Sequence, residues 1–474
     1  MVVAIILLAI FLRFYNYSGR LLLAGDQARD AIIAQEIVNE HKIPAVGPFS
    51  SVGNFTTGNI WYIWLGFSAA LIPTFEGPWI ILTLSYITIV ILMIIIARNI
   101  GDKSFSLIVG LLAAVSPAEV AQSTNLTNPS LVAVFSVLTL LFALLYLKKG
   151  TNLFLFLVAF FIGEAISTHF QAVYLLVLIP IVLVVKRPKL SGFVYLAIGL
   201  IIPFIAYFYF DFNHNFYNIR GIIDYVRFGQ YRIYIANRWL TYAAVFWPDM
   251  WGKIIGGNKL FGYLFMALVT LSTIYSLLKK QINKQLLSVV ATFAIVFVAL
   301  RFYRGERFDG YFVFLHPYVL LLSAFVIYFI YKLNKYLGLL ILFLVLIFSI
   351  NASLPALFDK QTEVNKGEYW SNVFIKDFPD KKFEFYQFTN SNESLSLPIV
   401  INLYKKGKIQ DGGYRIGFGG PKPADRKNYV YLKDNKLGFD LWSLNSSSSA
   451  QLIKSGWHKA NPSSIYKVSA EWYK

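Results

Sequence analysis

The feature that most constrains this chain is a series of apolar runs, roughly 17–20 residues each, that recur from residue 1 to about residue 351. A helix of that length crosses the ~30 Å hydrocarbon layer of a bilayer and satisfies its own backbone hydrogen bonds there. Of the 474 residues, 57% are hydrophobic and 14% are charged, and the mean hydropathy is +0.57, values that a water-soluble domain does not tolerate. The sequence therefore predicts an all-α polytopic membrane protein.

We predict about eleven transmembrane helices, with juxtamembrane helices between some of them. The spans lie near residues 1–15, 78–97, 104–118, 129–147, 152–168, 171–185, 191–210, 259–278, 285–300, 312–330 and 336–351. Alternate loops are short and basic, with Asp102 as their one acid: Arg98 and Lys103; Lys148 and Lys149; Lys186, Arg187 and Lys189; Lys279, Lys280 and Lys284; Lys332 and Lys335. The positive-inside bias puts these loops in the cytoplasm and the other loops outside, in the cell inner membrane.

Two segments leave alternatives. Residues 58–73 are apolar enough to cross, which would put residues 16–57 in the cytoplasm, and Arg13 and Arg20 favour that reversal. The segment is short, rich in Trp and Tyr and broken by Gly66 and Pro73, so we favour an interfacial helix. The first fifteen residues lack a basic n-region and a small-residue cleavage site, so we expect a retained span rather than a signal peptide.

The composition changes near Asn351, after which the chain is polar and rich in Lys, Asn, Ser, Gly and Tyr. We therefore predict a transmembrane domain over residues 1–351 and a small extracytoplasmic α/β soluble domain over residues 352–474. Phe383–Phe388 and residues 399–404 are strand-like.

The net charge of +18 would suit nucleic acid, but in a membrane protein basic residues first orient the chain and contact anionic lipid. We therefore expect membrane lipids and no nucleic acid as partners. The chain has no cysteine, which excludes disulfides, zinc-thiolate sites and a cysteine nucleophile.

The most informative stretch, GDQARDAIIAQEIVNEHKIP, follows the first span and has the apolar spacing of an amphipathic helix. Asp26 and Asp30 are four residues apart and share one helical face, with Arg29 beside both. An arginine there would hold an aspartate in place and keep it ionised as a base. Asp near a helix N-terminus is also a common cap, and spacing alone leaves both interpretations open.

This acidic stretch resembles the first outer loop of the C-fold glycosyltransferases, in particular the bacterial protein-mannosyltransferase-like members of family 39. The likeness continues in the aromatic stretch TTGNIWYIWLG, in SPAEVAQSTNLTNPS (residues 116–130), which is similar to their second outer loop, and in STHFQAVYLL (residues 167–176). It covers roughly residues 1–180 well and the later spans by topology alone.

The resemblance implies an inverting transfer in which Asp26 takes the proton of an acceptor hydroxyl while a lipid phosphate leaves the sugar. The family often has a second acid after the first, where this chain has Gln27, and an Asp in the second outer loop, where this chain has Asn125 and Asn128. Asp30 or Glu119 would have to supply a second carboxylate for a metal. We therefore predict no essential metal and no cofactor, with Asp30 as a second catalytic candidate and Asn128 as a substrate contact.

Cationic partners for a leaving phosphate are expected in RFYRGERFDGYFVFLHP, which carries Arg301, Arg304 and Arg307 before His316. The planar guanidinium group binds two phosphate oxygens and stays charged. Arginine beside Tyr and Phe at a membrane boundary also anchors helix ends to headgroups, so this alternative stays open.

His169, near Glu164 at the end of a span, would touch the sugar or phosphate or form a polar contact between packed helices. The segment from Asp211 to about Lys253 is rich in Arg, Tyr and Trp, and we expect it to cover the site with interfacial helices.

These observations predict a membrane glycosyltransferase that uses a polyprenyl-phosphate-linked sugar and an acceptor lipid, glycan or protein. The alternatives are a flippase or transporter of a lipid-linked saccharide, and a polysaccharide ligase or polymerase. No internal repeat of the kind common in transporters is visible.

Overall fold

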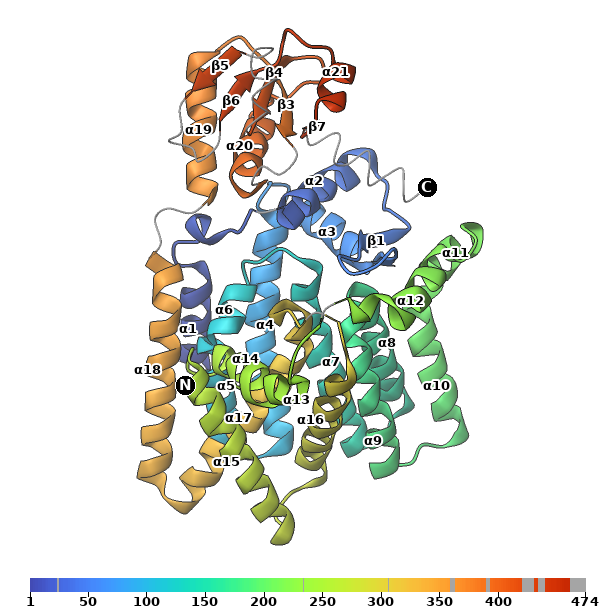
Figure 1. Ribbon diagram of the computed structural model, residues 1–474. Coiled ribbons are helices and arrows are strands. Elements are labelled where there is room, and N and C mark those ends of the chain that lie inside the picture. The colour runs from blue at the N-terminus through green and yellow to red at the C-terminus, as the bar shows by residue number, and fades with distance from the viewer. Residues whose placement is uncertain are drawn as a thin grey trace.

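The structure is a computed structural model that describes residues 1–23, 25–232, 234–305, 307–358, 363–388, 393–419, 430–433 and 440–460. It is a helical bundle with a small mixed α/β domain at one end (Figure 1). A helical polytopic fold with a small domain containing a sheet is thus confirmed.

Each of the eleven predicted spans coincides with apolar helix in the described part of the chain. Seven segments are long and apolar enough to cross a membrane on their own: α4 (Gly77–Ile100), α7 (Asn128–Lys149), α10 with α11 (Leu190–Asn213), α15 (Lys259–Leu278), α16 (Lys284–Phe302), Asp309–Leu333 ending in α17 (His316–Leu333), and α18 (Lys335–Phe358). The shorter apolar helices are α1 (Val2–Phe14), α3 (Ile60–Leu71), α5 (Lys103–Val115), α8 (Asn152–Thr168) and Phe170–Val185, which ends in α9 (Leu178–Val185). α18 continues to Phe358, beyond the change in composition at Asn351, and the division into domains there stays a prediction.

The chain between α1 and α4 stays at one end of the bundle. Tyr17, after α1, hydrogen-bonds Thr83 near the start of α4 with 3.0 Å between the two hydroxyl oxygens, so both ends of this segment lie on the same side. The segment holds α2 (Gly25–Glu40), the hairpin of β1 (Val46–Phe49) with β2 (Thr56–Gly58), and the twelve-residue α3. The geometry therefore agrees with an interfacial α3 that does not cross the membrane.

Arg13 and Arg20, which in sequence suggested a reversed orientation, have a structural role. The fully buried Arg13 donates to the backbone oxygens of Ala113 and Ala114, at 3.1 and 2.9 Å, where α5 ends. Arg20 donates to the oxygen of Leu12 at 2.8 Å and to that of Val120 at 3.2 Å. Arg13 thus donates hydrogen bonds to carbonyl oxygens at the C-terminus of α5, and Arg20 to one at the C-terminus of α1, where the helix itself supplies no donor.

The C-terminal domain has a five-stranded sheet in the order β5-β6-β4-β3-β7, in which β3 and β4 are parallel and the other pairs antiparallel. The strands are β3 (Phe383–Phe388), β4 (Tyr414–Phe418), β5 (Val430–Lys433), β6 (Leu441–Ser443) and β7 (Trp457–Lys459), and the helices are α19 (Glu363–Asp377), α20 (Glu393–Lys405) and α21 (Ser449–Lys454). The strand predicted at Phe383–Phe388 is confirmed.

The strand expected at residues 399–404 was wrong, because these residues belong to α20. Ile399, Val400 and Leu403 pack with the sheet, whereas Leu397 and Ile401 join the core of the membrane part. Burial on both sides gives this helix the continuous apolar run of a strand.

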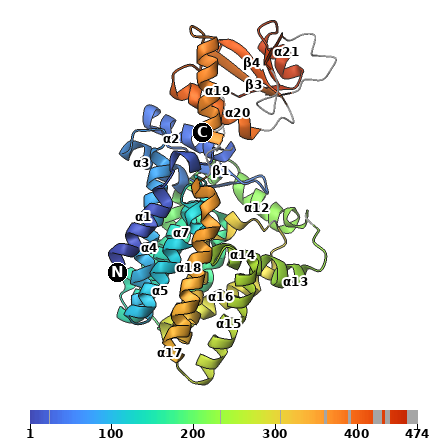
Figure 2. The same cartoon turned by 90° about the vertical axis from the view of Figure 1, so that its left-hand side faces the viewer.

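α20 docks the C-terminal domain onto α2. The Tyr404 hydroxyl donates to Glu36 Oε1 at 2.8 Å, and Lys405 forms an ion pair with Glu76. Figures 1 and 2 show α2 and α3 between the bundle and this domain in both views. The acidic helix is therefore braced from both sides.

We expect Arg13→Leu to lower the midpoint of thermal unfolding in detergent. The substitution strands the carbonyl oxygens of Ala113 and Ala114 in the protein interior, at a cost of about 2–4 kcal/mol. Arg98→Leu, at an exposed position at the end of α4, is the control and should unfold as the unaltered protein does. Equal midpoints for the two variants would contradict the structural role of Arg13.

Candidate active site

The acidic helix α2 is held by a buried carboxylate. Asp30 is fully buried, Arg29 Nε donates to its Oδ1 at 2.8 Å, and Trp61 Nε1 of α3 donates to its Oδ2 at 2.9 Å. Burial raises the pKa of Asp30 above its usual value, although the Arg29 guanidinium opposes that shift. With both oxygens engaged, Asp30 fixes the rotation of α2 against α3.

Asp26 has the opposite environment. Its side chain is 67% exposed, and Arg29 Nη1 donates to its Oδ1 at 2.9 Å. Arg29 therefore bridges an exposed carboxylate and a buried one. Asp26 lies in the first turn of α2, where the helix dipole favours a negative charge.

Asp26 lines a cavity of about 920 Å³, which we call the Asp26 cavity. Four predicted site residues meet there: Asp26, Arg29, Asn128 and His169. The cavity forms where helices end, since Asn128 begins α7, Ile166 lies in the last turn of α8 and Phe302 ends α16. Its volume is near the upper end for small-molecule sites, roughly 300–1,000 Å³.

Asn128 and His169 are positioned by local contacts. Asn128 Nδ2 donates to the oxygen of Thr168 at 2.8 Å. The His169 ring lies 4.8 Å from that of Tyr311, and burial lowers the pKa of His169 to about 3, so the imidazole is neutral at physiological pH. Among the described residues, no hydrogen bond joins His169 to Glu164.

The three predicted phosphate-binding arginines do not line the cavity. Each guanidinium group lies over an aromatic ring, Arg301 over Trp239 at 4.1 Å, Arg304 over Tyr231 at 5.0 Å and Arg307 over Tyr242 at 4.8 Å. Their neighbours Phe302, Tyr303 and Phe308 line the cavity instead. The arginines thus form a cationic patch beside the cavity, and burial together with nearby Arg238 lowers the pKa of Arg307.

Sequence reasoning missed an amide pair next to Asp26. Gln27 Nε2 donates to Asn125 Oδ1 at 2.7 Å, and Asn125 Nδ2 donates to Gln122 Oε1 at 3.2 Å. In sequence, Gln27 and Asn125 were notable only because the C-fold family often has an acidic residue at each of these positions. Gln27 of α2 and Asn125 lie 98 residues apart in the chain, so their pairing leaves no local signal in the sequence.

Hydroxyl groups and rings of distant segments complete the wall. The Tyr225 and Tyr303 hydroxyl oxygens lie 2.8 Å apart, and Ser51 Oγ lies 2.8 Å from the Tyr311 hydroxyl. Tyr225 belongs to α12 (Tyr217–Arg227), so the segment expected to cover the site does line the cavity.

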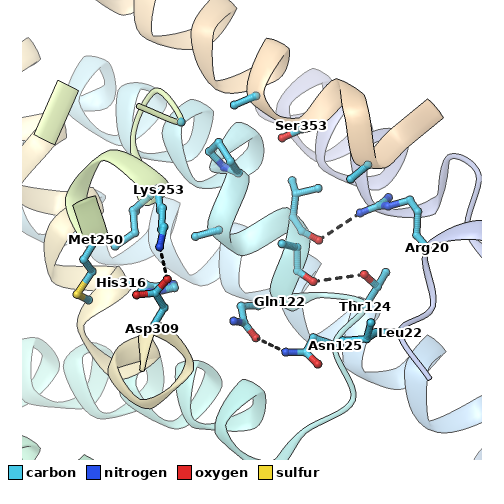
Figure 3. Close-up of a pocket in the computed structure, with 18 of the residues that line it drawn as sticks. Arg20, Leu22, Gln122, Thr124, Asn125, Met250, Lys253, Asp309, His316 and Ser353 are labelled. Carbon is cyan, nitrogen blue, oxygen red and sulfur yellow. Dashed lines mark hydrogen bonds and ion pairs between the residues drawn. The ribbon is translucent and has the colours of Figure 1, made fainter. Parts of the chain in front are cut away.

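A second cavity of about 590 Å³, the Lys253 cavity, adjoins the first, and Leu22 and Asn125 line both (Figure 3). Lys253 Nζ pairs with Asp309 Oδ2 in its wall, and Arg20 lies on the opposite side. His316 also lines it, and His316 Nδ1 lies 2.6 Å from Glu119 Oε1 in a buried pair.

The two carboxylates considered in the sequence analysis as possible metal ligands, Asp30 and Glu119, are bound by other side chains. Glu119 is engaged by His316, and Asp30 by Arg29 and Trp61. Within the described residues no group of three or more His, Cys, Asp or Glu is placed to hold a metal ion. The absence of an essential metal stays a prediction.

Comparison with solved structures identifies the architecture. ArnT from Cupriavidus metallidurans matches with a TM-score of 0.62 in its apo state and 0.65 with bound undecaprenyl phosphate, at 11% identity over 94% of this chain and 98% of that chain. The oligosaccharyltransferase of Archaeoglobus fulgidus in its apo form matches with a TM-score of 0.55, at 13% identity over 80% of this chain and 58% of that chain. These are C-fold glycosyltransferase structures.

The chain has the C-fold. At such low identity the likeness shows the fold alone, and the narrower resemblance to family 39 stays a prediction. No protein-family model and no curated protein sequence matches the chain.

We expect Asp30→Asn to destabilise the protein and Asp26→Asn to leave its stability nearly unchanged. Asp30→Asn replaces a buried acceptor of two hydrogen bonds and leaves Arg29 short of a partner, which costs about 2–4 kcal/mol. Asp26→Asn changes an exposed side chain and should leave the unfolding midpoint within a degree or so, because exposed ion pairs contribute little. Thermal unfolding in detergent measures both, and an equal loss in the two variants would contradict this division.

Proposed function

We propose that this chain is a membrane glycosyltransferase that moves a sugar from a polyprenyl-phosphate donor to an acceptor hydroxyl, with Asp26 as general base. The observation that carries the proposal is an exposed carboxylate, held by Arg29, in a cavity at the ends of membrane helices. The C-fold architecture supports it, since ArnT has been solved with undecaprenyl phosphate and the Archaeoglobus oligosaccharyltransferase with a tethered acceptor peptide.

The rim of the Asp26 cavity suits a lipid-linked donor. Val173, Val226, Phe302 and Phe308 line the cavity and are also exposed. Apolar side chains that are exposed at the ends of membrane helices are surrounded by acyl chains, so an isoprenoid tail would meet no polar barrier there. The donor would therefore approach from the bilayer with its sugar directed toward Asp26.

The chemistry follows from Asp26 as a base. The acceptor oxygen forms a bond to the anomeric carbon as its proton moves to the Asp26 carboxylate, and the bond from that carbon to the phosphate oxygen breaks with its electron pair. Attack opposite the leaving group inverts the configuration. The Lys253 cavity, which adjoins at Leu22 and Asn125, offers the acceptor a separate approach.

The leaving phosphate gains negative charge, which nearby cations stabilise. Arg29 is the cation within the Asp26 cavity, and it is shared by Asp26 and Asp30. We therefore assign Arg301, Arg304 and Arg307 to the phosphate through the positive potential of their patch, with the guanidinium groups on their aromatic partners. Asn128 and His169 are assigned to the sugar.

Asp26→Asn should abolish sugar transfer, a loss of roughly 10²–10⁴-fold for removal of a general base. The assay is transfer from a polyprenyl-phosphate sugar by protein purified in detergent, where no two compartments exist, so a flippase or transporter would be inactive in it. Gln35→Ala, on the same helix but not in the cavity, is the control and should retain activity. A fully active Asp26→Asn protein would remove Asp26 from the role of base.

We place the site and the C-terminal domain on the extracytoplasmic face. Figure 1 shows the connections of α9 to α10, α15 to α16 and α17 to α18, which carry basic residues, at the end of the bundle away from the C-terminal domain. Because the chain has no cysteine, single substitutions can be labelled on intact cells. Lys42→Cys and Asp380→Cys should react with a membrane-impermeant maleimide and Lys149→Cys only after permeabilisation. The reverse pattern would contradict the assignment.

A further inference from the structure

A segment with two short helices, α12 and α13 (Arg238–Leu240), lies on the outside of the bundle. It follows the apolar run Leu190–Asn213, which is long enough to cross a membrane. Figure 2 shows α12 and α13 on the outer side of the bundle, in the half nearer the C-terminal domain. A chain that leaves a crossing helix enters the headgroup layer of the bilayer, so we expect α12 to begin at that depth.

One side of α12 is fixed to the rest of the protein. Asn218 is fully buried, and its Oδ1 accepts hydrogen bonds from the Thr56 backbone N–H at 2.8 Å and from Thr56 Oγ1 at 3.0 Å. The Asp211 carboxylate accepts from the backbone N–H groups of Asn218 and Ile219, at 2.6 and 3.1 Å, and so caps the start of the helix. These contacts determine which side of α12 faces away from the protein.

The outward side of α12 mixes arginine with apolar side chains. Arg220, Ile223 and Arg227 are three or four residues apart, share one side of the helix and are all exposed. Val226, next to Arg227, is 55% exposed. A helix face in contact with water is usually polar, whereas a helix in the headgroup layer carries apolar side chains next to basic ones.

The residues after α12 have the same character. Large apolar or aromatic side chains there are more than half exposed: Phe228 at 71%, Tyr231 at 53%, Tyr234 at 90%, Trp239 at 58% and Leu240 at 63%. Tyrosine and tryptophan favour the headgroup layer, because their rings are apolar and their O–H and N–H groups are polar. We call the exposed set the α12 surface: Arg220, Ile223, Val226, Arg227, Phe228, Tyr231, Arg232, Tyr234, Trp239 and Leu240.

The α12 surface is positively charged. Between residues 217 and 240 the chain has four arginines and one acid, Asp224. Arg220, Arg227 and Arg232 are exposed, and no ion pair among the described residues includes them. Guanidinium groups bind phosphate oxygens in pairs and stay charged. A partner that covers this surface must therefore be apolar and must carry negative charge beside its apolar part.

We propose that the α12 surface binds anionic phospholipids in the membrane leaflet at this end of the bundle. Arg220, Arg227 and Arg232 bind the lipid phosphates, and the apolar side chains lie among the upper acyl chains. Phosphatidylcholine also has a phosphate, but its ammonium group cancels the charge, so the arginines favour lipids with net negative charge. The inference is independent of the proposed function, because none of these three arginines lines the Asp26 cavity.

The test uses the full chain in nanodiscs, with one reporter on the α12 surface. Because the chain has no cysteine, Tyr234→Cys can carry a single fluorophore at a fully accessible position. The nanodiscs contain phosphatidylcholine with a small fraction of one quencher lipid, which has a nitroxide on its acyl chain and either a phosphatidylglycerol or a phosphatidylcholine headgroup. The ratio of quenching by the two lipids measures the local enrichment of anionic lipid. We expect a ratio of about three or more at low salt, and a ratio near one at high salt because ions screen the attraction.

Matched variants connect the enrichment to these arginines. The double substitution Arg227→Gln and Arg232→Gln should bring the ratio close to one. Asp224→Asn removes the acid of this segment and should raise the ratio, a change that misfolding would not produce. Arg187→Gln is the control, because this exposed arginine lies in the connection of α9 to α10 at the other end of the bundle, and it should leave the ratio unchanged.

Three results would overturn the proposal. Equal quenching by the two lipids in the unaltered chain would mean that the surface meets the membrane without selecting charge. Quenching by neither lipid would mean that the surface lies outside the membrane, in water or against another protein. An enrichment that persists in the Arg227 and Arg232 double variant would assign it to other cations, such as the cationic patch of Arg301, Arg304 and Arg307.

Discussion

The site depends on the buried contact of Asp30 with Arg29 and Trp61. A carboxylate removed from water is stable only when its oxygens are bonded and its charge is balanced, and here Arg29 Nε and Trp61 Nε1 serve one oxygen each. Since Trp61 lies in α3 and Arg29 in α2, the contact fixes the rotation and height of one helix against the other. It also directs Arg29 Nη1 to the exposed oxygen of Asp26. One arginine therefore links the stability of α2 to the position of the proposed base.

The same helix is braced on its other side by the C-terminal domain. Leu397 and Ile401 of α20 lie in the membrane-side core, and Tyr404 binds Glu36 near the end of α2. A helix parallel to a membrane surface gains less burial than one inside a bundle, because one face remains in water or headgroups. Contacts from α3 below and α20 above supply the packing that α2 lacks, so the domain forms part of the support of the site.

The fold was largely predictable because the bilayer restricts it to one kind of element. Span length located eleven apolar helices, and the segment of residues 58–73 contains the twelve-residue α3, whose interfacial position stays a prediction. The strand expected at residues 399–404 was wrong because tertiary burial overrides local pattern: both sides of α20 are buried, which gives its sequence the apolar run of a strand. Arg13, weighed in sequence as an orientation signal, binds the carbonyl groups at the end of α5.

The candidate site was predictable only in part, for a related reason. Asp26 and Arg29 are neighbours on one helix, so their proximity follows from the sequence. Asn128 came from the resemblance to the C-fold family and His169 from its place near Glu164 at the end of a span, and the structure brings both into the same cavity. The pairing of Gln27 with Asn125 depends on how segments distant in the chain pack, and so do the contacts of the three arginines with Trp239, Tyr231 and Tyr242. No spacing along the chain encodes these contacts.

Under the proposed function, the separation of the Asp26 cavity from the cationic patch beside it would suit a lipid-linked substrate. A polyprenyl-phosphate sugar is apolar at one end, anionic in the middle and hydroxylated at the other end, so a matching surface must present these three properties in that order. The exposed side chains of Val173, Phe302 and Phe308 would meet the apolar tail, the patch of Arg301, Arg304 and Arg307 the phosphate, and the amides and aromatic hydroxyls of the cavity the sugar. If the arginines pointed into the cavity, they would compete with Arg29 for Asp26, and a base held by several guanidinium groups loses its affinity for a proton. Under the proposed function, their aromatic partners would keep that positive charge near the phosphate and away from Asp26.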